Sequence, residues 1–344
     1  MSEPTQPKTL LVWNKGIAAL CDRRFPDEFP DGRNYIPVPT LAGALFCSAL
    51  PDNVISGPSI QESLREGDLV WVRLSWLKAF IRQALPFMQA RIVLVTGDSD
   101  SCVPSELGTE AHTILQSPKV IHWFAQNYDG SLKSDRISPL PIGIDFHTLA
   151  EKPCWGENST SPAQQEEVLR FVRASLAPVK NRVQKVYVDF AWQRSFGLFH
   201  YRRYHPLKGT TFRQSRRWIA RKMGKNTCVF CQTGPLSRTQ MWRERGRYAF
   251  VLSPHGMGLD CHRTWEALAL GHIVLVPSSS LDPLYDGLPV VPLKSWGDIT
   301  SEKLREWLAL YSAGQGVNVK LKSQHWIDRM RSVASNLVSQ SVKC

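Results

Sequence analysis

The stretch Tyr248–Gly271, YAFVLSPHGMGLDCHRTWEALALG, decides the fold. It predicts a buried strand over 248–252, a glycine-bearing loop over 253–258 and a helix over 260–270. A strand that runs through a short loop into a helix is the repeating unit of α/β domains with parallel sheets. The first amides of such a helix lack backbone partners, and the helix dipole adds positive potential there. The loop is therefore a natural site for an anion.

The same stretch carries a cluster of polar side chains. Gly256 and Gly258 allow the backbone to approach a ligand closely. His262, Arg263 and Glu266 are spaced so that all three can lie near one edge of the helix. The candidate binding residues of this stretch are Ser253, His255, Gly256, Gly258, Asp260, His262, Arg263 and Glu266. A glycine turn before a salt-bridged helix would explain the glycines alone, but the whole cluster favours a site for phosphates and hydroxyls.

The rest of the chain indicates two α/β halves. Strand patterns alternate with helical patterns over residues 1–150, which predicts an N-terminal doubly wound α/β domain. Residues 151–165 are rich in Pro, Ser and Asn and are interpreted as a linker. A second α/β series fills residues 166–320. A helix within 321–344 is expected to pack back toward the N-terminal domain.

Polar side chains follow several predicted strands of the N-terminal half. Each alone could be a turn former or a helix cap. Together they indicate a shared site, because the carboxyl ends of parallel strands meet at one edge of a sheet. The residues are Asp98, Asp100, Gln126, Asn127, Asp145 and His147.

Composition narrows the class of protein. The chain has 344 residues with 43% hydrophobic residues, enough for two domains with real cores. It has no apolar run of transmembrane length and no signal-peptide pattern, so a cytoplasmic location is expected. The eight cysteines are scattered, which is not the pattern of a disulfide scaffold or a zinc site.

The net charge of +12 is concentrated in one segment. Residues 178–225 hold 13 Lys or Arg and one acid, Asp189. A local field of this sign recruits nucleic acid, acidic lipid or phosphate-bearing small molecules. It also suits a peripheral contact with an anionic membrane.

The segment Ser237–Thr300 resembles exostosin-like glycosyltransferases, which are like glycosyltransferase family 47 and have the GT-B fold. The resemblance rests on SPHGMGLDCHRTWEAL followed by a buried strand and LDPLYDGLPVV. Weaker matches, LVWVRLSWLKAF, IVLVTGDSD, WFAQN and LPIGID, extend it over about residues 67–310. It implies two Rossmann-like domains facing an interdomain cleft, with the acceptor on the N-terminal side.

The resemblance also implies roles for particular residues. The C-terminal domain would bind a nucleotide-sugar donor, a UDP- or GDP-sugar, as co-substrate and without a cofactor. Glu266 would accept hydrogen bonds from a ribose diol. The residues themselves make Arg263 a candidate for bidentate phosphate binding. Arg213, Arg216 and Arg217 are further phosphate candidates because they precede or open a predicted helix, and Arg238 could reach phosphate or lie on the surface of its helix. The enzyme would transfer a hexosyl or pentosyl group in glycan biosynthesis, to a glycan, glycoprotein or glycolipid.

The chemistry needs a stabilised leaving diphosphate and an oriented acceptor hydroxyl. No DxD motif stands in the donor half, so a metal-independent mechanism without metal ligands is expected. Asp98 and Asp100 are then candidates for the catalytic base, with Asp145 a weaker one.

Two alternatives stay open. One is a nucleic-acid-binding protein, because the basic segment interleaves cations with aromatic side chains. These are Trp192, Phe196, Phe199, Tyr201, Tyr204 and Trp218. Such a protein would bind with a steep dependence on salt. The other is a non-catalytic module that binds sugars or nucleotides without turnover.

Overall fold

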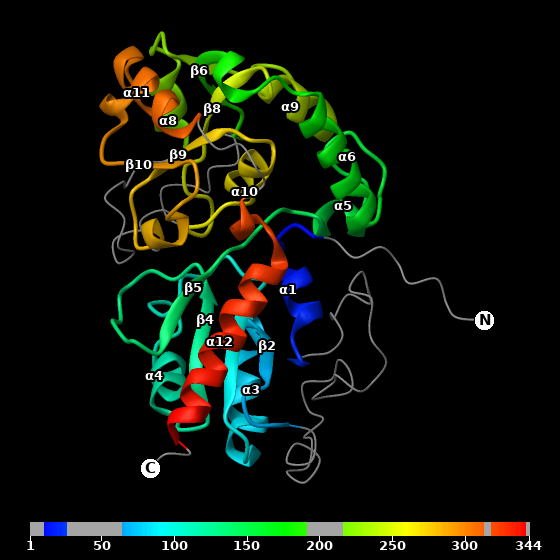
Figure 1. The fold of residues 1–344 in the computed structure, drawn as a ribbon, viewed down its shortest axis with the longest axis vertical. Helices are drawn as coiled ribbons and strands as arrows, with labels where there is room; N and C mark the ends of the chain where they lie inside the picture. Colours follow the sequence, from blue (N-terminus) through cyan, green and yellow to red (C-terminus); the bar gives the residue numbers. More distant parts are fainter. Residues whose placement is uncertain (1–9, 26–63, 191–215, 313–317, 342–344) are drawn as a thin grey trace, which may run out of the picture. The chain divides into compact units, whose positions relative to one another are not determined.

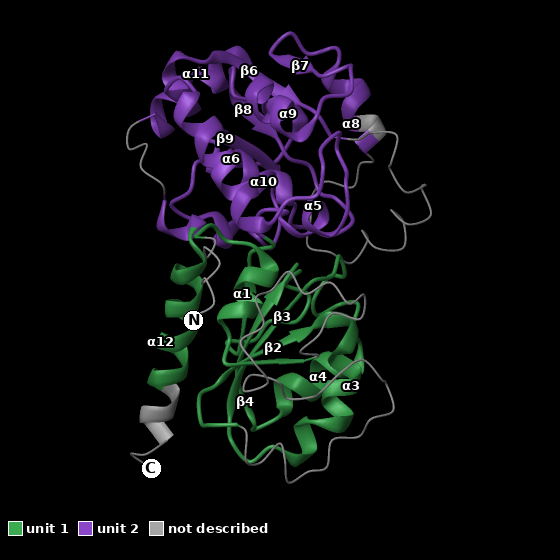
Figure 2. Cartoon of the chain, turned by 90° about the vertical axis from the view of Figure 1, so that its right-hand side faces the viewer, with its two compact units in different colours: residues 1–142, 322–344 green, residues 143–321 purple. Residues whose placement is uncertain are grey.

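The structure is a computed structural model that describes residues 10–25, 64–190, 216–312 and 318–341. The chain divides into two compact units, unit 1 (residues 1–142 and 322–344) and unit 2 (residues 143–321), coloured separately in Figure 2. Each unit contains one five-stranded sheet, and all neighbouring strands in both sheets run parallel. This confirms the expected α/β class with two parallel-sheet units. The boundary lies between Ile142 and Gly143 and not at 150, because residues 143–150, with Asp145 and His147, belong to unit 2. Residues 151–165, interpreted as a linker, also belong to unit 2.

Unit 1 has the strand order β1-β2-β3-β4-β5. Its strands are β1 (Arg23–Phe25), β2 (Leu69–Arg73), β3 (Ile92–Gly97), β4 (Val120–Gln126) and β5 (Ile137–Leu140). Its helices are α1 (Asn14–Leu20), α3 (Leu77–Gln83), α4 (Thr109–Gln116) and α12 (Ser323–Ser341). Helices α3 and α4 lie on one face of the sheet and α12 on the other, beside α1 (Figure 2). Because both faces are covered, the central strand β3 is buried throughout, and its first four residues are apolar.

Unit 2 has the strand order β10-β9-β8-β6-β7. Its strands are β6 (Val183–Val188), β7 (Val229–Cys231), β8 (Tyr248–Leu252), β9 (Ile273–Pro277) and β10 (Val290–Leu293). Its helices are α5 (His147–Glu151), α6 (Pro162–Ser175), α8 (Arg216–Met223), α9 (Arg238–Arg245), α10 (His262–Ala269) and α11 (Ser301–Tyr311), as Figure 1 shows. Helices α8 and α11 share one apolar core with the sheet.

The strand order of unit 2 contains a topological switch point. The first strand, β6, lies between β7 and β8, so the sheet grows in one direction from β6 to β7 and in the other from β8 onward. In open parallel sheets, ligands bind at the carboxyl ends of the two strands that flank such a point. A ligand site is therefore expected at the loops after β6 and β8.

None of the helices in the described ranges is long and apolar enough to cross a lipid bilayer.

A buried histidine makes unit 1 sensitive to acid. His122 of β4 is 7% exposed, and its Nε2 lies 2.9 Å from the Ser138 hydroxyl. Burial first, and then the charge of Arg329, lower the pKa of His122 to about 4. The unfolded chain takes up this proton below a pH of about 6.5, before the folded chain does, so stability falls as the pH drops from there toward 4.

We expect the wild-type protein to lose roughly 2 kcal/mol of unfolding free energy at pH 5 through His122. Urea denaturation at pH 7 and pH 5 checks this, with His122→Gln as the comparison. The variant should lose less stability between the two pH values than the wild type does. Equal losses of stability in the two proteins would show that His122 does not cause the pH dependence.

Candidate functional site

The candidate site lies at the carboxyl ends of β6 and β8 in unit 2. Asp189 and Phe190 follow β6 directly, and the glycine loop 253–258 follows β8. The strand, loop and helix predicted over 248–270 are present, with the helix, α10, beginning at His262. The loop thus connects the switch point of the sheet to the N-terminus of α10.

Hydrogen bonds within the loop hold its shape. The Gly256 amide donates to the Gly258 carbonyl at 3.1 Å, and His255 Nδ1 donates to the Leu259 carbonyl at 2.8 Å. A Cβ on Gly256 would lie 3.1 Å from Nη2 of Arg216 and 3.1 Å from Sγ of Cys261. That separation is tighter than a Cβ normally tolerates, so glycine is what permits a guanidinium to lie against the loop.

Ser253 and Asp260 fasten the loop to α10. The hydroxyls of Ser253 and Thr264 are 2.9 Å apart. The carboxylate of Asp260 accepts hydrogen bonds from Trp265 Nε1, at 3.0 and 2.8 Å, and from the Tyr285 hydroxyl at 3.2 Å. Both predicted ligand residues are buried and bonded within the fold, and their side chains hold the loop against the helix.

The two ends of α10 differ in their electrostatics. At the C-terminal end the Leu270 carbonyl accepts from Arg173 Nη1 at 2.7 Å and from Arg182 Nη2 at 3.1 Å. Gly271 follows with φ +75°, and a Cβ there would lie 1.8 Å from Arg173 Nη1. At the N-terminal end the capping residue, Cys261, makes no side-chain cap. Cations thus neutralise the negative end of the helix dipole, and the positive end faces the loop.

Two guanidinium groups flank Phe190 beside this positive end. The Cζ atoms of Arg216 and Arg263 each lie 5.9 Å from the Phe190 ring centroid. Arg216 Nε donates to the His255 carbonyl at 3.1 Å. Within the described part of the chain, no carboxylate lies within ion-pair distance of Arg216. Burial lowers the pKa of this guanidinium, and the charge of Arg263 lowers it further.

Arg263 begins a buried chain of ion pairs. Its Nε lies 2.8 Å from Asp189 Oδ1, and Arg245 Nη2 lies 2.5 Å from Asp189 Oδ2. Burial alone would raise the pKa of Asp189, but Arg245 and Arg263 together hold it below its usual value. Arg245 Nη1 also lies 3.7 Å from Glu266 Oε2. Asp189 thus keeps two arginines in place, one of them beside the loop.

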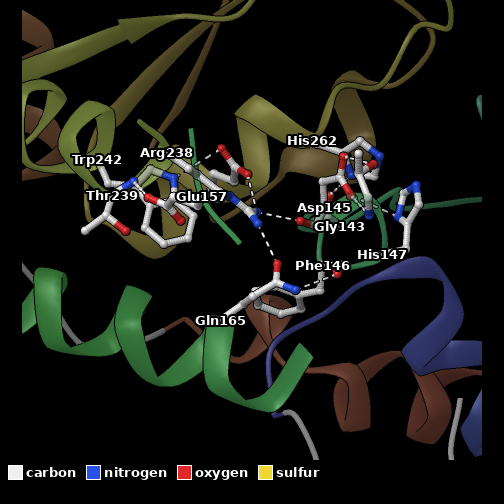
Figure 3. A network of polar contacts seen from close by, with 12 residues as sticks. Gly143, Asp145, Phe146, His147, Glu157, Gln165, Arg238, Thr239, Trp242 and His262 are labelled. Atoms are coloured by element: carbon white, nitrogen blue, oxygen red, sulfur yellow. Dashed lines mark hydrogen bonds and ion pairs between the residues drawn. The ribbon is translucent and has the colours of Figure 1, made fainter. Parts of the chain in front are cut away.

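Glu266 and Arg238 continue this chain, drawn in part in Figure 3. Arg238 Nη2 lies 2.8 Å from Glu266 Oε1 and 2.5 Å from the Asp145 carbonyl, and its Nη1 lies 2.6 Å from Gln165 Oε1. The Arg238 guanidinium also lies over the rings of Trp155 and Trp242, 5.0 and 4.6 Å from their centroids. Arg238 is only 2% exposed, so the structure places it in the interior with Glu266 as its partner.

His262 turns away from Arg263 into a second cluster. Its Nδ1 donates to the Gly143 carbonyl at 2.7 Å, and its ring centroid lies 5.4 Å from that of His147 (Figure 3). His147 Nδ1 lies 3.1 Å from Asp145 Oδ1. Burial opposes ionisation of Asp145, but His262, His147 and the Thr148 amide bring its pKa down to about 2. Asp145 is therefore a carboxylate at neutral pH.

The other two predicted bases lie in unit 1. Asp98 follows β3 with φ +58°, and its carboxylate lies 2.9 Å from Arg73 Nε and 3.8 Å from Lys15 Nζ. Asn14 Nδ2 also donates to it at 3.3 Å. Asp100 is exposed. Asp98 therefore lies between two cations, whereas Asp100 faces solvent.

Some site residues could not be predicted from the sequence, and some predicted ones lie outside the residues that the structure describes. Arg245 and Phe190 carry no local signal, whereas Asp189 was visible as the single acid of the basic segment, directly after a strand. Residues 191–215, which include Arg213 and most aromatic residues of that segment, lie outside the described residues, as do the side chains of Arg217 and Trp218.

No protein-family model and no curated protein sequence matches this chain. Solved structures with some likeness include a trehalose-6-phosphate structure from E. coli bound with UDP-2-fluoro glucose, at 12% identity and TM-score 0.37 over 83% of this chain and 75% of that one. An alpha,alpha-trehalose-phosphate synthase (UDP-forming) from Burkholderia xenovorans matches at 14% identity and TM-score 0.33, over 83% and 76% of the chains. A UDP-GlcNAc 2-epimerase from Methanocaldococcus jannaschii matches at 11% identity and TM-score 0.33, over 77% of this chain and 76% of that one. At these TM-scores and identities we draw no conclusion from the likenesses.

Proposed function

We propose that this protein is a glycosyltransferase that moves a sugar from a nucleotide-diphosphate sugar to a hydroxyl acceptor. The observation that carries the proposal is the pair Arg216 and Arg263 at the uncapped N-terminus of α10. Half-buried cations are normally paired, and no carboxylate of the described residues pairs with Arg216. A diphosphate would supply the missing counter-charge at the switch point of the sheet.

The resemblance of 237–300 to exostosin-like glycosyltransferases supports this donor class. In those enzymes this segment belongs to the donor domain of a GT-B fold, so we propose unit 2 as the donor unit and unit 1 as the acceptor unit. The donor would be a UDP- or GDP-sugar and the acceptor a hydroxyl of a glycan or glycoconjugate.

We propose that the two arginines, rather than Glu266, make the primary donor contacts. Glu266 is 7% exposed and already lies against Arg238 and Trp242. These partners already contact both carboxylate oxygens, so fewer lone pairs are left for a ribose hydroxyl. The amides of loop 253–258 and of the first turn of α10 would complete the phosphate contacts.

The transfer breaks the bond between the anomeric carbon and the diphosphate oxygen, and the electron pair leaves with the diphosphate. The acceptor oxygen forms the new bond to that carbon, and its proton passes to a base. We propose that Arg216, Arg263 and the helix amides stabilise the leaving diphosphate without a cation bound by a DxD motif. Asp98 and Asp100 stay the candidates for the base, and Asp145, whose pKa is about 2, is the weaker one.

A donor-hydrolysis assay over a panel of UDP- and GDP-sugars tests this function. Water can take the place of the acceptor hydroxyl, so we expect one donor to be hydrolysed faster than the others. Arg263→Met should lower this turnover. If no donor is hydrolysed and no nucleotide binds, while nucleic acid binds tightly with a steep salt dependence, the alternative built on the basic segment would replace this proposal.

A further inference from the structure

Three potential metal ligands meet on one side of unit 2, apart from the ion pairs of Arg263. Asp145 stands in the loop after β5, His147 is the first residue of α5, and His262 is the first residue of α10. One ligand atom from each lies within 4.8 Å of the other two. More than a hundred residues of sequence separate His262 from the other two, so the fold brings the cluster together.

Hydrogen bonds from neighbouring groups orient these potential ligands. A carbonyl only accepts hydrogen bonds, so the contact with the Gly143 carbonyl puts the proton of His262 on Nδ1 and leaves the lone pair on Nε2. The Asp145 carboxylate accepts from the Thr148 amide at 2.9 Å and from the Thr148 hydroxyl at 2.8 Å. Metal-binding histidines and carboxylates are oriented by such bonds.

The backbone around Asp145 is fixed as well. Its carbonyl accepts from the buried guanidinium of Arg238, and the next carbonyl, of Phe146, accepts from Gln165 at 2.9 Å (Figure 3). These contacts set the position of the loop before any ion binds. A pre-positioned loop reduces the entropy that binding would otherwise cost.

We propose that Asp145, His147 and His262 bind a divalent transition-metal ion of the zinc class. Two imidazoles and one carboxylate suit Zn²⁺, Co²⁺ or Fe²⁺, whereas Mg²⁺ and Ca²⁺ prefer oxygen ligands. Bond lengths of about 2.0–2.2 Å would place the ligand atoms roughly 3.5 Å apart, so binding would draw the three side chains slightly together. The His147 side chain is only partly buried.

The ion would join the loop before α5 to the first turn of α10. This inference does not rest on the proposed glycosyl transfer, since it is tested by metal binding alone. It also differs from the metal clamp of a DxD motif, which holds a hard cation through carboxylates.

Isothermal titration of the chelator-stripped full chain with Zn²⁺ tests the site. We expect one ion per chain, and a loss of at least about 100-fold in affinity in His147→Asn and in Asp145→Asn. Two matched controls should bind as the wild type does: His112→Asn, an exposed histidine of α4, and Cys154→Ser, a free cysteine near Asp145. Equal affinity in wild type and in the Asp145→Asn, His147→Asn double variant would overturn the proposal.

X-ray absorption at the zinc edge of the wild-type protein gives a second test that needs no variant. Two imidazole ligands with an oxygen shell are expected. A sulfur shell would show that cysteines hold the ion, and it would overturn the proposal. The proposal would also be overturned if the protein bound no zinc at micromolar concentrations of the ion.

Discussion

Asp189→Asn is expected to lower the free energy of unfolding of unit 2 by about 3–5 kcal/mol, the range for breaking a buried ion pair. The carboxylate of Asp189 is 2% exposed and holds Arg245 and Arg263 at once. The substitution keeps the shape of the side chain and removes its charge. Among the described residues, Arg245, 1% exposed, would then retain only Glu266 as an acidic partner, at 3.7 Å. A buried cation left with one distant partner is costly.

Urea denaturation combined with hydrogen exchange of peptides from β8 and α10 measures this loss. The control is Glu244→Gln on the same unit, because Glu244 pairs with Arg247, whose side chain is 67% exposed. An exposed pair of this kind contributes little to stability, because solvent screens the two charges. If Asp189→Asn costs no more than the control, the buried chain of ion pairs does not hold the site together.

Arg263→Met and Arg216→Met are each expected to weaken binding of UDP or GDP by roughly 10–100-fold, since a charge-assisted hydrogen bond is worth about 1.5–3 kcal/mol. Methionine removes the charge and keeps an apolar stem over Phe190. Asp189 retains Arg245 when Arg263 is replaced, so this variant should fold.

Isothermal titration with each nucleotide diphosphate measures the effect. Arg170→Met is the matched control, because Arg170 is an exposed arginine of α6 in the same unit. It should bind as the wild type does. Unchanged affinity in both Arg216→Met and Arg263→Met would show that the diphosphate does not bind at this loop. Replacing Glu266 is a weaker test, because it would also disturb the buried pair with Arg238.

The sequence was sufficient to predict the α/β class and the unit around β8 and α10. The strand 248–252 is apolar throughout and is bounded by a glycine loop, and the helix shows a polar edge and an apolar side, so local pattern defines both elements. The capping box of Ser237 with Gln240 likewise marks the start of α9 in the sequence.

The partners of the charged residues could not be predicted, because they depend on tertiary contacts. Glu266 looked available for a ligand on its helix, yet Arg238 and Arg245 reach it from α9. His262 and Arg263 are adjacent in sequence, but they enter different clusters because successive side chains point about 100° apart around a helix. The unit boundary at Ile142 and Gly143 also reflects contacts that composition does not reveal.

A crystal structure with the tighter-binding nucleotide diphosphate tests the central claim most directly. We predict that its phosphates lie at the N-terminus of α10, within hydrogen-bond distance of Arg216 and Arg263 and of the amides of loop 253–258. Phosphates bound elsewhere on the chain, with both guanidinium groups still in their present contacts, would contradict it.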